Sequence, residues 1–330
     1  MNSPTPNTQA HLVAIHTEME FLNERIRFNL HSEVGLINTI SDYIIGAGGK
    51  RLRPALLILL SKALHADSSQ LKNAIELATV IELIHTATLL HDDVVDNSTL
   101  RRNRLTANAA YGNSAAVLVG DFLYSRAFQM MTQTGLMPVM DLMADTTNTI
   151  AEGEVLQLLN CKNPNTTEAQ YMKVIQFKTA KLFEAACQLA GIVCQVPNHQ
   201  LSILGQFGAN LGTAFQLIDD VLDYEGNPNH LGKEIGDDLR EGKPTLPLIF
   251  AREKGSTYTQ ELIEAAVKNG GSNEIDAILK GIQACGALDY TRQHAQNLAD
   301  QALKNISFLD NTRYKVALQN LCAIAVHRTQ

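Results

Sequence analysis

Two aspartate clusters with the same spacing are the residues of this chain best suited to chemistry. Residues 92–96 read DDVVD and residues 219–223 read DDVLD, each within apolar sequence of helical periodicity. Residues four apart share one face of a helix, so Asp92 and Asp96 point the same way, as do Asp219 and Asp223. Each helix therefore presents a pair of like charges on one face.

Such pairs favour a site for divalent cations. Like charges repel, and the apolar neighbours indicate that neither pair lies on an ordinary solvated face; these neighbours include Leu89, Leu90, Leu217, Ile218 and Leu222. Hard divalent cations prefer oxygen ligands, so facing pairs on two helices could hold several Mg²⁺ ions. That positive charge needs an anion, and diphosphate is the natural one. A chance origin is a fair alternative for one cluster and a poor one for two.

Cationic residues occur near the first cluster and before it. Residues 48–54 read GGKRLRP, a glycine-rich turn that carries three cations into a predicted helix. Helix N-termini favour phosphate, and arginine supplies bidentate donors, although a solvated turn is the simpler alternative. Arg101, Arg102 and Arg104 follow the first cluster. They could pair with its carboxylates or hold a diphosphate.

Three polar residues in predicted helices lie where they could contact a metal or a substrate. His85 precedes Asp92 by seven residues, on nearly the same helical face, where metal or ligand contact competes with a structural role. Lys178 lies in the apolar segment 177–179, and a buried lysine without an anion is costly. Gln216 precedes Asp219 by three residues. Together they could place a cation and polar oxygens near a reacting carbon.

Helical periodicity dominates the chain, and no convincing alternation typical of strands occurs. Residues typical of helix ends support several of the predicted boundaries. Gly48 and Gly49 are suited to end the helix before them, and Pro54 is suited to the first turn of the next helix. Thr167 and Gln170 have the spacing of a capping box. The periodicity predicts helices over residues 11–31, 32–47, 54–66, 69–96, 115–134, 138–159, 167–196, 200–224, 245–254, 260–269, 273–284, 287–306 and 311–328.

The pattern predicts one all-α domain over residues 1–330, with residues 1–10 disordered. No linker divides the chain, and no short repeat occurs. Residues 225–244 form a polar, glycine-rich stretch directly after the second cluster. A long structureless stretch in a compact domain is often functional, so we expect a lid over the active site.

Composition excludes several classes of protein. Hydrophobic residues make up 45% of the 330, the net charge is −7, and tryptophan is absent, which argues against nucleic-acid binding. The five cysteines show no CxxC spacing and are expected to be buried free thiols in a reducing compartment. The N-terminus lacks a signal-peptide pattern, and we see no membrane-spanning run. We expect a cytoplasmic protein that is not integral to a membrane.

Five motifs in order closely resemble those of the trans-polyprenyl diphosphate synthases. They are GGKRLRP, LLHDDVVD with a downstream Arg-Arg pair, FKT, FQLIDDVLDY and GDDLREGKPTLP. The resemblance spans residues 32–328 and is greatest to long-chain bacterial octaprenyl diphosphate synthases that make the quinone side chain. It implies the class I isoprenoid synthase fold, an all-α bundle of long helices around a deep central cavity, and a homodimer.

The resemblance also implies roles for individual residues. Three Mg²⁺ ions would be bound by Asp92, Asp96 and Asp219, with support from Asp93, Asp220 and Asp223. The allylic diphosphate would be contacted by Arg101, Lys178, Lys233 and Lys243. Isopentenyl diphosphate would be held by Lys50, Arg53, His85 and Arg102. Catalysis would involve Lys178, with the side-chain oxygens of Thr179 and Gln216 near the developing carbocation.

The resemblance further implies a long product, built from farnesyl diphosphate as the primer and octaprenyl in length. Ala87 and Thr88 lie one helical turn before the first cluster, where short-chain relatives carry bulky residues. Here the path would be open, and its floor would be formed by Phe128, Met131 and Met143. The alternative is that Ala87 and Thr88 are small only for helix packing.

One residue departs from the family pattern, and two alternative functions have to be weighed against the synthase. The chain has Asn103 where the family often has glycine after the Arg-Arg pair, and no ligand is lost. A class I terpene cyclase shares the aspartate chemistry but needs no second diphosphate site, so Lys50, Arg53 and Arg102 argue against it. A non-catalytic subunit of a heteromeric synthase loses aspartates or cations, and none is missing here.

Overall fold

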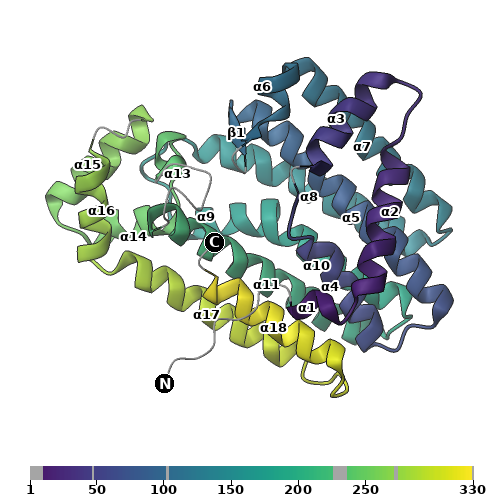
Figure 1. Ribbon diagram of the computed structural model, residues 1–330. Helices are drawn as coiled ribbons and strands as arrows, with labels where there is room; N and C mark the ends of the chain where they lie inside the picture. Colours follow the sequence, from purple (N-terminus) through teal and green to yellow (C-terminus); the bar gives the residue numbers. More distant parts are fainter. Residues whose placement is uncertain (1–9, 47, 102–103, 226–235, 271–273, 329–330) are drawn as a thin grey trace. The chain divides into compact units, whose positions relative to one another are not determined.

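The computed structural model describes residues 10–46, 48–101, 104–225, 236–270 and 274–328 (Figure 1). Its long elements are all helices, which confirms the all-α prediction. The chain divides into two compact units, which are described separately. Unit 1 comprises residues 1–144, 182–205 and 306–321, and unit 2 comprises residues 145–181, 206–305 and 322–330. A single domain over 1–330 stays a prediction. Of the predicted disordered residues 1–10, the first nine lie outside the described residues.

Unit 1 is built around the apolar helix α4 and the long helix α5. Its elements are α1 (Ala10–Val13), α2 (His16–Leu30), α3 (Gly35–Gly46), α4 (Leu52–Ala63), α5 (Ser68–Val95), α6 (Ala107–Tyr111) and α7 (Asn113–Gln133), with parts of α8 (Met137–Asn160), α10 (Lys181–Val193), α11 (Asn198–Glu225) and α18 (Arg313–His327). Helix α5 packs against α2, α4 and α7. Because residues 55–60 of α4 are apolar and fully buried, this part of the helix lies at the centre of the core.

Helix α5 carries the first aspartate cluster, and its start is fixed by a capping box. Asp67 accepts hydrogen bonds from the backbone of Ser69 and Gln70, and the Gln70 side chain accepts one from the backbone of Asp67. In the described part of the chain, α5 alone is long and apolar enough to cross a membrane by length and composition. Inside the protein 61% of its apolar window is buried.

Three short features of unit 1 differ from the predicted elements. Strands β1 (Leu100–Arg101) and β2 (Arg104–Leu105) form an antiparallel hairpin after α5. Two residues per strand are too few to show the alternation that is typical of strands, so periodicity does not predict them. Helix α6 was also not predicted. A turn at residues 14–15 divides the predicted helix 11–31 into α1 and α2.

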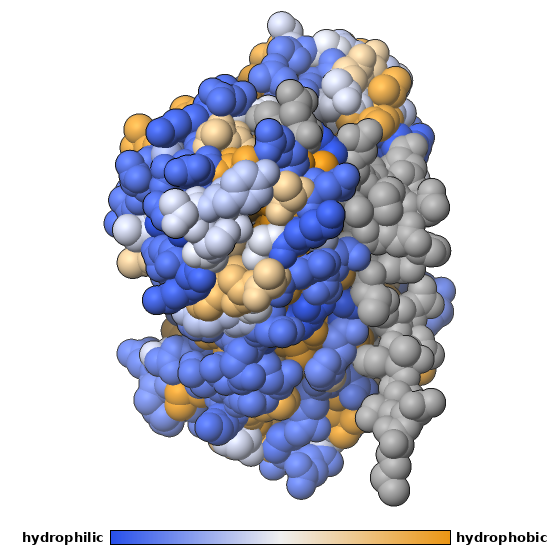
Figure 2. Space-filling view, turned by 90° about the vertical axis from the view of Figure 1, so that its left-hand side faces the viewer, coloured by the Kyte–Doolittle hydropathy of each residue, from blue (hydrophilic) through white to orange (hydrophobic). Residues whose placement is uncertain are grey.

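Unit 2 holds the second cluster on α11. Its other elements are α9 (Glu168–Ile175), the π-helix η1 (Gln176–Ala180), α13 (Asp237–Arg240), α14 (Leu246–Lys254), α15 (Thr257–Asn269), α16 (Ile275–Ala284) and α17 (Ala287–Asn305). Helix α14 packs against α9, α15, α16 and α17. The surface over α15 and α16 is mostly hydrophilic (Figure 2), whereas Ile263 and Ile282 of these helices lie in the core, as expected of amphipathic helices.

The predicted helix 167–196 is interrupted by the π-helix η1, which separates α9 from α10. Such wider turns occur frequently at functional sites. Gly153 of α8 permits a close approach to η1, because a Cβ atom there would lie 2.6 Å from the backbone nitrogen of Lys178. A side chain at position 153 would push this part of η1 away from α8.

The predicted lid, residues 225–244, is described only in part. Residues 226–235 lie outside the described residues, while residues 237–240 form the helical turn α13. The backbone nitrogen of Gly236, whose φ is +77°, donates to the Asp223 carbonyl at 2.9 Å. The described end of this segment is thus tied to the second cluster, and a lid function stays a prediction.

All five cysteines are free, as predicted. Cys187 and Cys322 are buried and the other three are half-buried, so the expectation of burial is confirmed for two of them. Burial raises the pKa of Cys322 to about 12 and that of Cys194 to about 11. Both thiols are therefore poor nucleophiles near neutral pH.

Candidate active site

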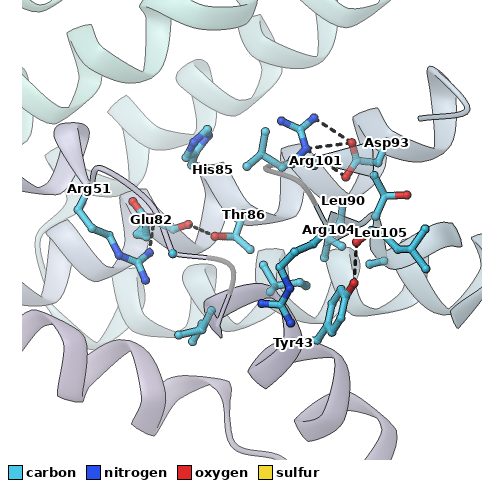
Figure 3. Close-up of a pocket in the computed structure, with 16 residues that line it drawn as sticks. Tyr43, Arg51, Glu82, His85, Thr86, Leu90, Asp93, Arg101, Arg104 and Leu105 are labelled. Atoms are coloured by element: carbon cyan, nitrogen blue, oxygen red, sulfur yellow. Dashed lines mark hydrogen bonds and ion pairs between the residues drawn. The ribbon is translucent and has the colours of Figure 1, made fainter. Parts of the chain in front are cut away.

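A pocket in unit 1 lies beside the first aspartate cluster (Figure 3). It is bounded by the end of α3, the turn before α4, the second half of α5 and the hairpin β1–β2. Its charged and aromatic lining residues are Tyr43, Arg51, Glu82, His85, Asp93, Arg101 and Arg104. Among them His85, Asp93 and Arg101 are predicted site residues, and Arg51 belongs to the GGKRLRP motif. The fold therefore brings residues of the first two motifs to one cavity, together with His85.

Asp93 and Arg101 point toward each other across this pocket (Figure 3). Nη2 of Arg101 donates to Oδ1 of Asp93 at 2.8 Å, and Nε donates to the same oxygen at 3.0 Å. Burial raises the pKa of Asp93 above its usual range, while Arg101 opposes this shift. Of the two sequence interpretations of Arg101, pairing with the cluster is thus realised in the structure. Its contact with a diphosphate stays a prediction.

The turn before α4 is anchored by an ion pair that the sequence did not indicate. Arg51 lies at the N-cap of α4 in the left-handed region, with φ of 50°. Its Nη1 is hydrogen-bonded to the carboxylate of Glu82 on α5, and both side chains are largely buried. Because the partners are 31 residues apart, no local spacing could reveal them.

Two of the predicted isopentenyl diphosphate residues lie together. Nη1 of Arg53 is 3.2 Å from Nε2 of His85. The Arg53 guanidinium also lies 4.3 Å from the ring centre of Phe183, a cation–π contact that was not predicted. Lys50 is exposed on the same turn. The structure therefore holds Arg53 in a fixed orientation beside His85.

In unit 2 the FKT segment forms part of η1. Nζ of Lys178 lies 2.6 Å from Oε2 of Glu154 on α8, so this lysine has the anion that its burial requires. Sequence reasoning missed Glu154, which is 24 residues away. Oγ1 of Thr179 donates to Oε1 of Gln216 at 3.2 Å, so these two side chains are adjacent.

The second cluster is closely surrounded by donors. Oδ1 of Asp219 lies 2.6 Å from Nη2 of Arg328, whose side chain is only 4% exposed. Asp220 is buried and accepts hydrogen bonds from Gln216, at 2.8 Å, and from the Tyr171 hydroxyl. Burial raises the pKa of Asp220 well above its usual range.

The expectation of an unpaired, mutually repelling pair is therefore wrong for Asp219, because Arg328 is its charge partner. Asp93 and Asp220, the middle aspartates of the two clusters, also have donors, in Arg101 and Tyr171. Asp223 also accepts a hydrogen bond, from the backbone nitrogen of Asp238 at 3.3 Å. Arg101 and Arg328 each compensate one carboxylate charge, whereas the other partners are neutral donors.

The carboxylates fit the way in which magnesium binds to proteins. In the part of the chain that the structure describes, no three His, Cys, Asp or Glu side chains are grouped closely enough to form a metal cage. Mg²⁺ usually takes one or two carboxylates together with waters and substrate phosphates. Asp92 and Asp96, both partly exposed on one face of α5, offer such a pair. Asp219, 42% exposed, offers a further oxygen.

The remaining predicted residues fall into three groups. Arg102 and Lys233 lie outside the described residues. Lys243 lies 2.6 Å from Glu241 and belongs to unit 2. The predicted chain-length residues all belong to unit 1, where Ala87, Met131 and Met143 are fully buried and Thr88 and Phe128 are half-buried. That they line a cavity for the growing chain stays a prediction.

Comparisons with known proteins agree with this geometry. The profile of the polyprenyl synthetase family matches residues 34–282. The chain is 48% identical to octaprenyl diphosphate synthase of Escherichia coli over 312 residues, which are 94% of this chain and 96% of that protein. It is 43% identical to an all-trans-nonaprenyl-diphosphate synthase of Rhodobacter capsulatus, over 94% of each chain.

Solved structures give the same result for the fold. A polyprenyl synthase from Caulobacter crescentus, complexed with calcium and isoprenyl diphosphate, superposes with a TM-score of 0.94, at 38% identity and over 100% of both chains. The predicted class I isoprenoid synthase fold is thereby confirmed. By its profile match, its relatives and its fold, this chain belongs to the polyprenyl synthetase family.

Proposed function

We propose that this protein condenses isopentenyl diphosphate repeatedly, head to tail, onto farnesyl diphosphate and releases octaprenyl diphosphate for quinone side-chain synthesis. The observation that carries this proposal is the complete set of aspartate and cation motifs in a chain 48% identical to an octaprenyl diphosphate synthase. The chain has residues for both substrates. Carboxylates can bind the cations that hold the allylic diphosphate, and arginine, lysine and histidine side chains can bind isopentenyl diphosphate.

Isopentenyl diphosphate binds to Lys50, Arg53 and His85, with Arg102 as a fourth contact. Support comes from the Arg53 guanidinium, which is held between His85 at 3.2 Å and the Phe183 ring at 4.3 Å. A guanidinium already fixed in position loses less entropy when it binds an anion. His85 contributes its imidazole from α5.

The allylic diphosphate binds to Asp92, Asp96 and Asp219 through magnesium, in three ions, with Arg101, Lys178, Lys233 and Lys243 as direct contacts. When bound, Mg²⁺ neutralises the charge that builds on the leaving diphosphate. Lys178 keeps its ammonium group in place through Glu154, at 2.6 Å. Asp93 orients Arg101 through two hydrogen bonds.

Ionisation leaves an allylic carbocation, which an apolar site protects from water. The hydroxyl of Thr179 and the amide oxygen of Gln216 stabilise the positive charge near the reacting carbon. Support comes from their hydrogen bond of 3.2 Å, which keeps the two oxygens adjacent. The double bond of isopentenyl diphosphate then attacks this carbon, and the departing diphosphate takes the proton.

Product length depends on the path beside α5. Ala87 and Thr88 leave room for the growing chain, and Phe128, Met131 and Met143 close its end. Support comes from their common location in unit 1, where α5 packs on α7, and from the burial of Ala87, Met131 and Met143. The small side chain of Ala87 and the large ones of the methionines suit these two roles.

The protein acts as a homodimer in the cytoplasm, without a membrane-integral segment. Support for the dimer comes from Val155, Leu158 and Leu159 of α8, which are 58%, 64% and 70% exposed and lie on one helical face. An exposed apolar stripe of this kind suits a self-complementary interface with a second copy. Analytical ultracentrifugation of wild type and Leu158→Glu would test this assignment.

The central experiment uses one purified protein with isopentenyl diphosphate, farnesyl diphosphate and Mg²⁺. Elongation that stops on addition of EDTA, and that Asp92→Ala lowers by orders of magnitude, supports the proposal. A cyclic hydrocarbon formed from the allylic diphosphate alone would indicate a terpene cyclase. Elongation only after a second protein is added would indicate a subunit of a heteromeric synthase.

A further inference from the structure

In unit 2 a chain of hydrogen bonds connects four side chains from three elements. The Tyr171 hydroxyl of α9 donates to Oδ2 of Asp220, and Nε2 of Gln216 donates to Oδ1 of Asp220 at 2.8 Å. Oγ1 of Thr179 in η1 donates to Oε1 of Gln216 at 3.2 Å. Tyr171 is 5% exposed and Asp220 is 2% exposed, so water does not compete at this end of the chain.

This arrangement allows Gln216 only one orientation of its amide. Reversal would place the amide oxygen against Oδ1 of Asp220, where two acceptors repel. Because the Tyr171 hydroxyl donates to Oδ2, Oδ1 of Asp220 is left as the acceptor that faces the Gln216 amide. The amide NH₂ group therefore stays on Asp220, and the amide oxygen stays beside Thr179.

The orientation matters because the two ends of the amide have opposite polarity. With the oxygen beside Thr179, two partial negative charges are adjacent, which suits a neighbouring carbocation. With the NH₂ group there, a partial positive charge would oppose it. The difference is large in a water-poor site, where electrostatic interactions are less screened.

We propose that Tyr171 is a positioning residue for the prenyl transfer reaction, and that it acts through Asp220 to fix the amide orientation of Gln216. The proposal rests on the proposed function, in which Gln216 and Thr179 stabilise the carbocation. It assigns Asp220 a positioning role, since both of its oxygens are taken by protein donors. Asp219 and Asp223, on either side of it, are partly exposed and keep their role toward magnesium.

The test compares two buried tyrosines of unit 2. Tyr171→Phe removes the hydroxyl from Asp220. Tyr224→Phe, the matched control, removes an equally buried hydroxyl, which lies 3.2 Å from Oγ1 of Thr245. The loss of one buried hydrogen bond predicts a fall in kcat of about tenfold for Tyr171→Phe. Both KM values and the Mg²⁺ concentration for half-maximal rate stay at the wild-type level, and the control changes kcat by less than about twofold.

A double-mutant cycle separates positioning from general destabilisation. In a Gln216→Met background no amide remains to be oriented, so adding Tyr171→Phe has no further effect on kcat. A merely structural role for Tyr171 would lower the rate equally in both backgrounds. Additive effects, equal losses in the two tyrosine variants, or a raised Mg²⁺ requirement in Tyr171→Phe would each overturn the proposal.

A second pair of variants covers the case in which Tyr171→Phe loses the circular dichroism spectrum of the wild type. Thr179→Val breaks the same chain of hydrogen bonds at its other end, and Thr179→Ser restores the hydroxyl. The proposal predicts that Thr179→Val lowers kcat and that Thr179→Ser recovers it, and equal rates in the two would overturn it. Inactive wild-type protein would refute the proposed function itself, whereas an active wild type with an unaffected Tyr171→Phe variant would refute only the inference.

Discussion

The guanidinium of Arg328 lies 2.6 Å from the carboxylate of Asp219, the first aspartate of the second cluster. The same Nη2 atom of Arg328 also donates to the Phe215 carbonyl at 2.6 Å, and its guanidinium stacks on the Phe215 ring at 3.6 Å. Burial lowers the pKa of Arg328, while Asp219 opposes the shift. Asp219 is thus the counter-ion of a cation that is almost entirely buried.

We therefore predict that Asp219→Ala destabilises the protein, whereas repulsion within the cluster alone would predict the opposite. Removal of the carboxylate leaves a buried guanidinium without its charge partner. Because Asp219 is 42% exposed, the expected loss in unfolding free energy is reduced to about 1–3 kcal/mol. Urea denaturation in EDTA would measure it. In Asp219→Ala/Arg328→Met most of the loss should be recovered, and a wild-type value for Asp219→Ala alone would contradict the prediction.

The Arg51–Glu82 ion pair leads to a second prediction. Glu82→Ala leaves Arg51 buried without its carboxylate, so we expect a loss of about 3 kcal/mol in unfolding free energy. Because Arg51 is adjacent to Lys50 and two residues from Arg53, which are proposed ligands of isopentenyl diphosphate, the KM for isopentenyl diphosphate should rise more than the KM for the allylic substrate. Steady-state kinetics with each substrate varied would show the difference.

The comparison variant is Arg53→Ala, which removes a proposed ligand and leaves the ion pair intact. It should raise the KM for isopentenyl diphosphate without a comparable loss of stability. Equal effects of either variant on both KM values would argue against separate sites for the two diphosphates.

Local patterns explain why the helices and the aspartates could be predicted. The start of α4 is predicted from Pro54 and the apolar run that follows it, and the shared face of Asp92 and Asp96 is predicted from their four-residue spacing. Both signals involve only residues that are close in the sequence. Glu82, Glu154 and Arg328 could not be predicted in the same way, because their partners lie 31, 24 and 109 residues away. Such pairings depend on how helices pack, and helical periodicity does not determine this.

The π-helix and the hairpin were missed for related reasons. Residues 176–180 have an ordinary helical pattern, and their wider turn comes with the close approach of Gly153 to Lys178. Leu100 and Leu105 pair across a hairpin with strands of two residues, too short for any periodicity. Both features carry predicted site residues, so tertiary packing within each unit sets the local details around them.

A third prediction concerns pH. Burial raises the pKa of Asp220 well above its ordinary value of 3.8. The folded protein then binds this proton more tightly than the unfolded chain, so the contribution of Asp220 to stability is full below pH 3.8 and is lost as the pH rises through the folded pKa. Asp220→Asn removes the titration. The unfolding free energy of wild type minus that of Asp220→Asn should fall with rising pH, with a limiting slope of about 1.4 kcal/mol per pH unit.

Urea titrations of both proteins in EDTA at a series of pH values above 4 would give this difference directly. The subtraction removes the contributions of the other carboxylates, which are common to both proteins. A difference that is independent of pH, or that rises with pH, would show that Asp220 is ionised as easily in the folded protein as in the unfolded chain.

A fourth prediction concerns product length. Ala87 is fully buried on α5, about 7.5 Å along the helix from Asp92. Ala87→Phe should place a ring across the proposed path and give shorter products, while binding and ionisation of the allylic diphosphate survive. Overpacking costs about 1–3 kcal/mol, so Ala302→Phe, at a fully buried alanine of α17, serves as the control for general strain.

Chromatography of the dephosphorylated products would compare the two variants with the wild type. The control should keep the wild-type product, with a lower yield at most. An unchanged long product from active Ala87→Phe would place the growing chain elsewhere.

The most direct test of the proposed activity is the mass of the product that the purified protein makes from farnesyl diphosphate and isopentenyl diphosphate with Mg²⁺. The proposed activity should yield octaprenyl diphosphate, with intermediates that differ by single isoprene units. Farnesyl diphosphate that remains unchanged, or that is lost without the addition of any isoprene unit, would contradict it.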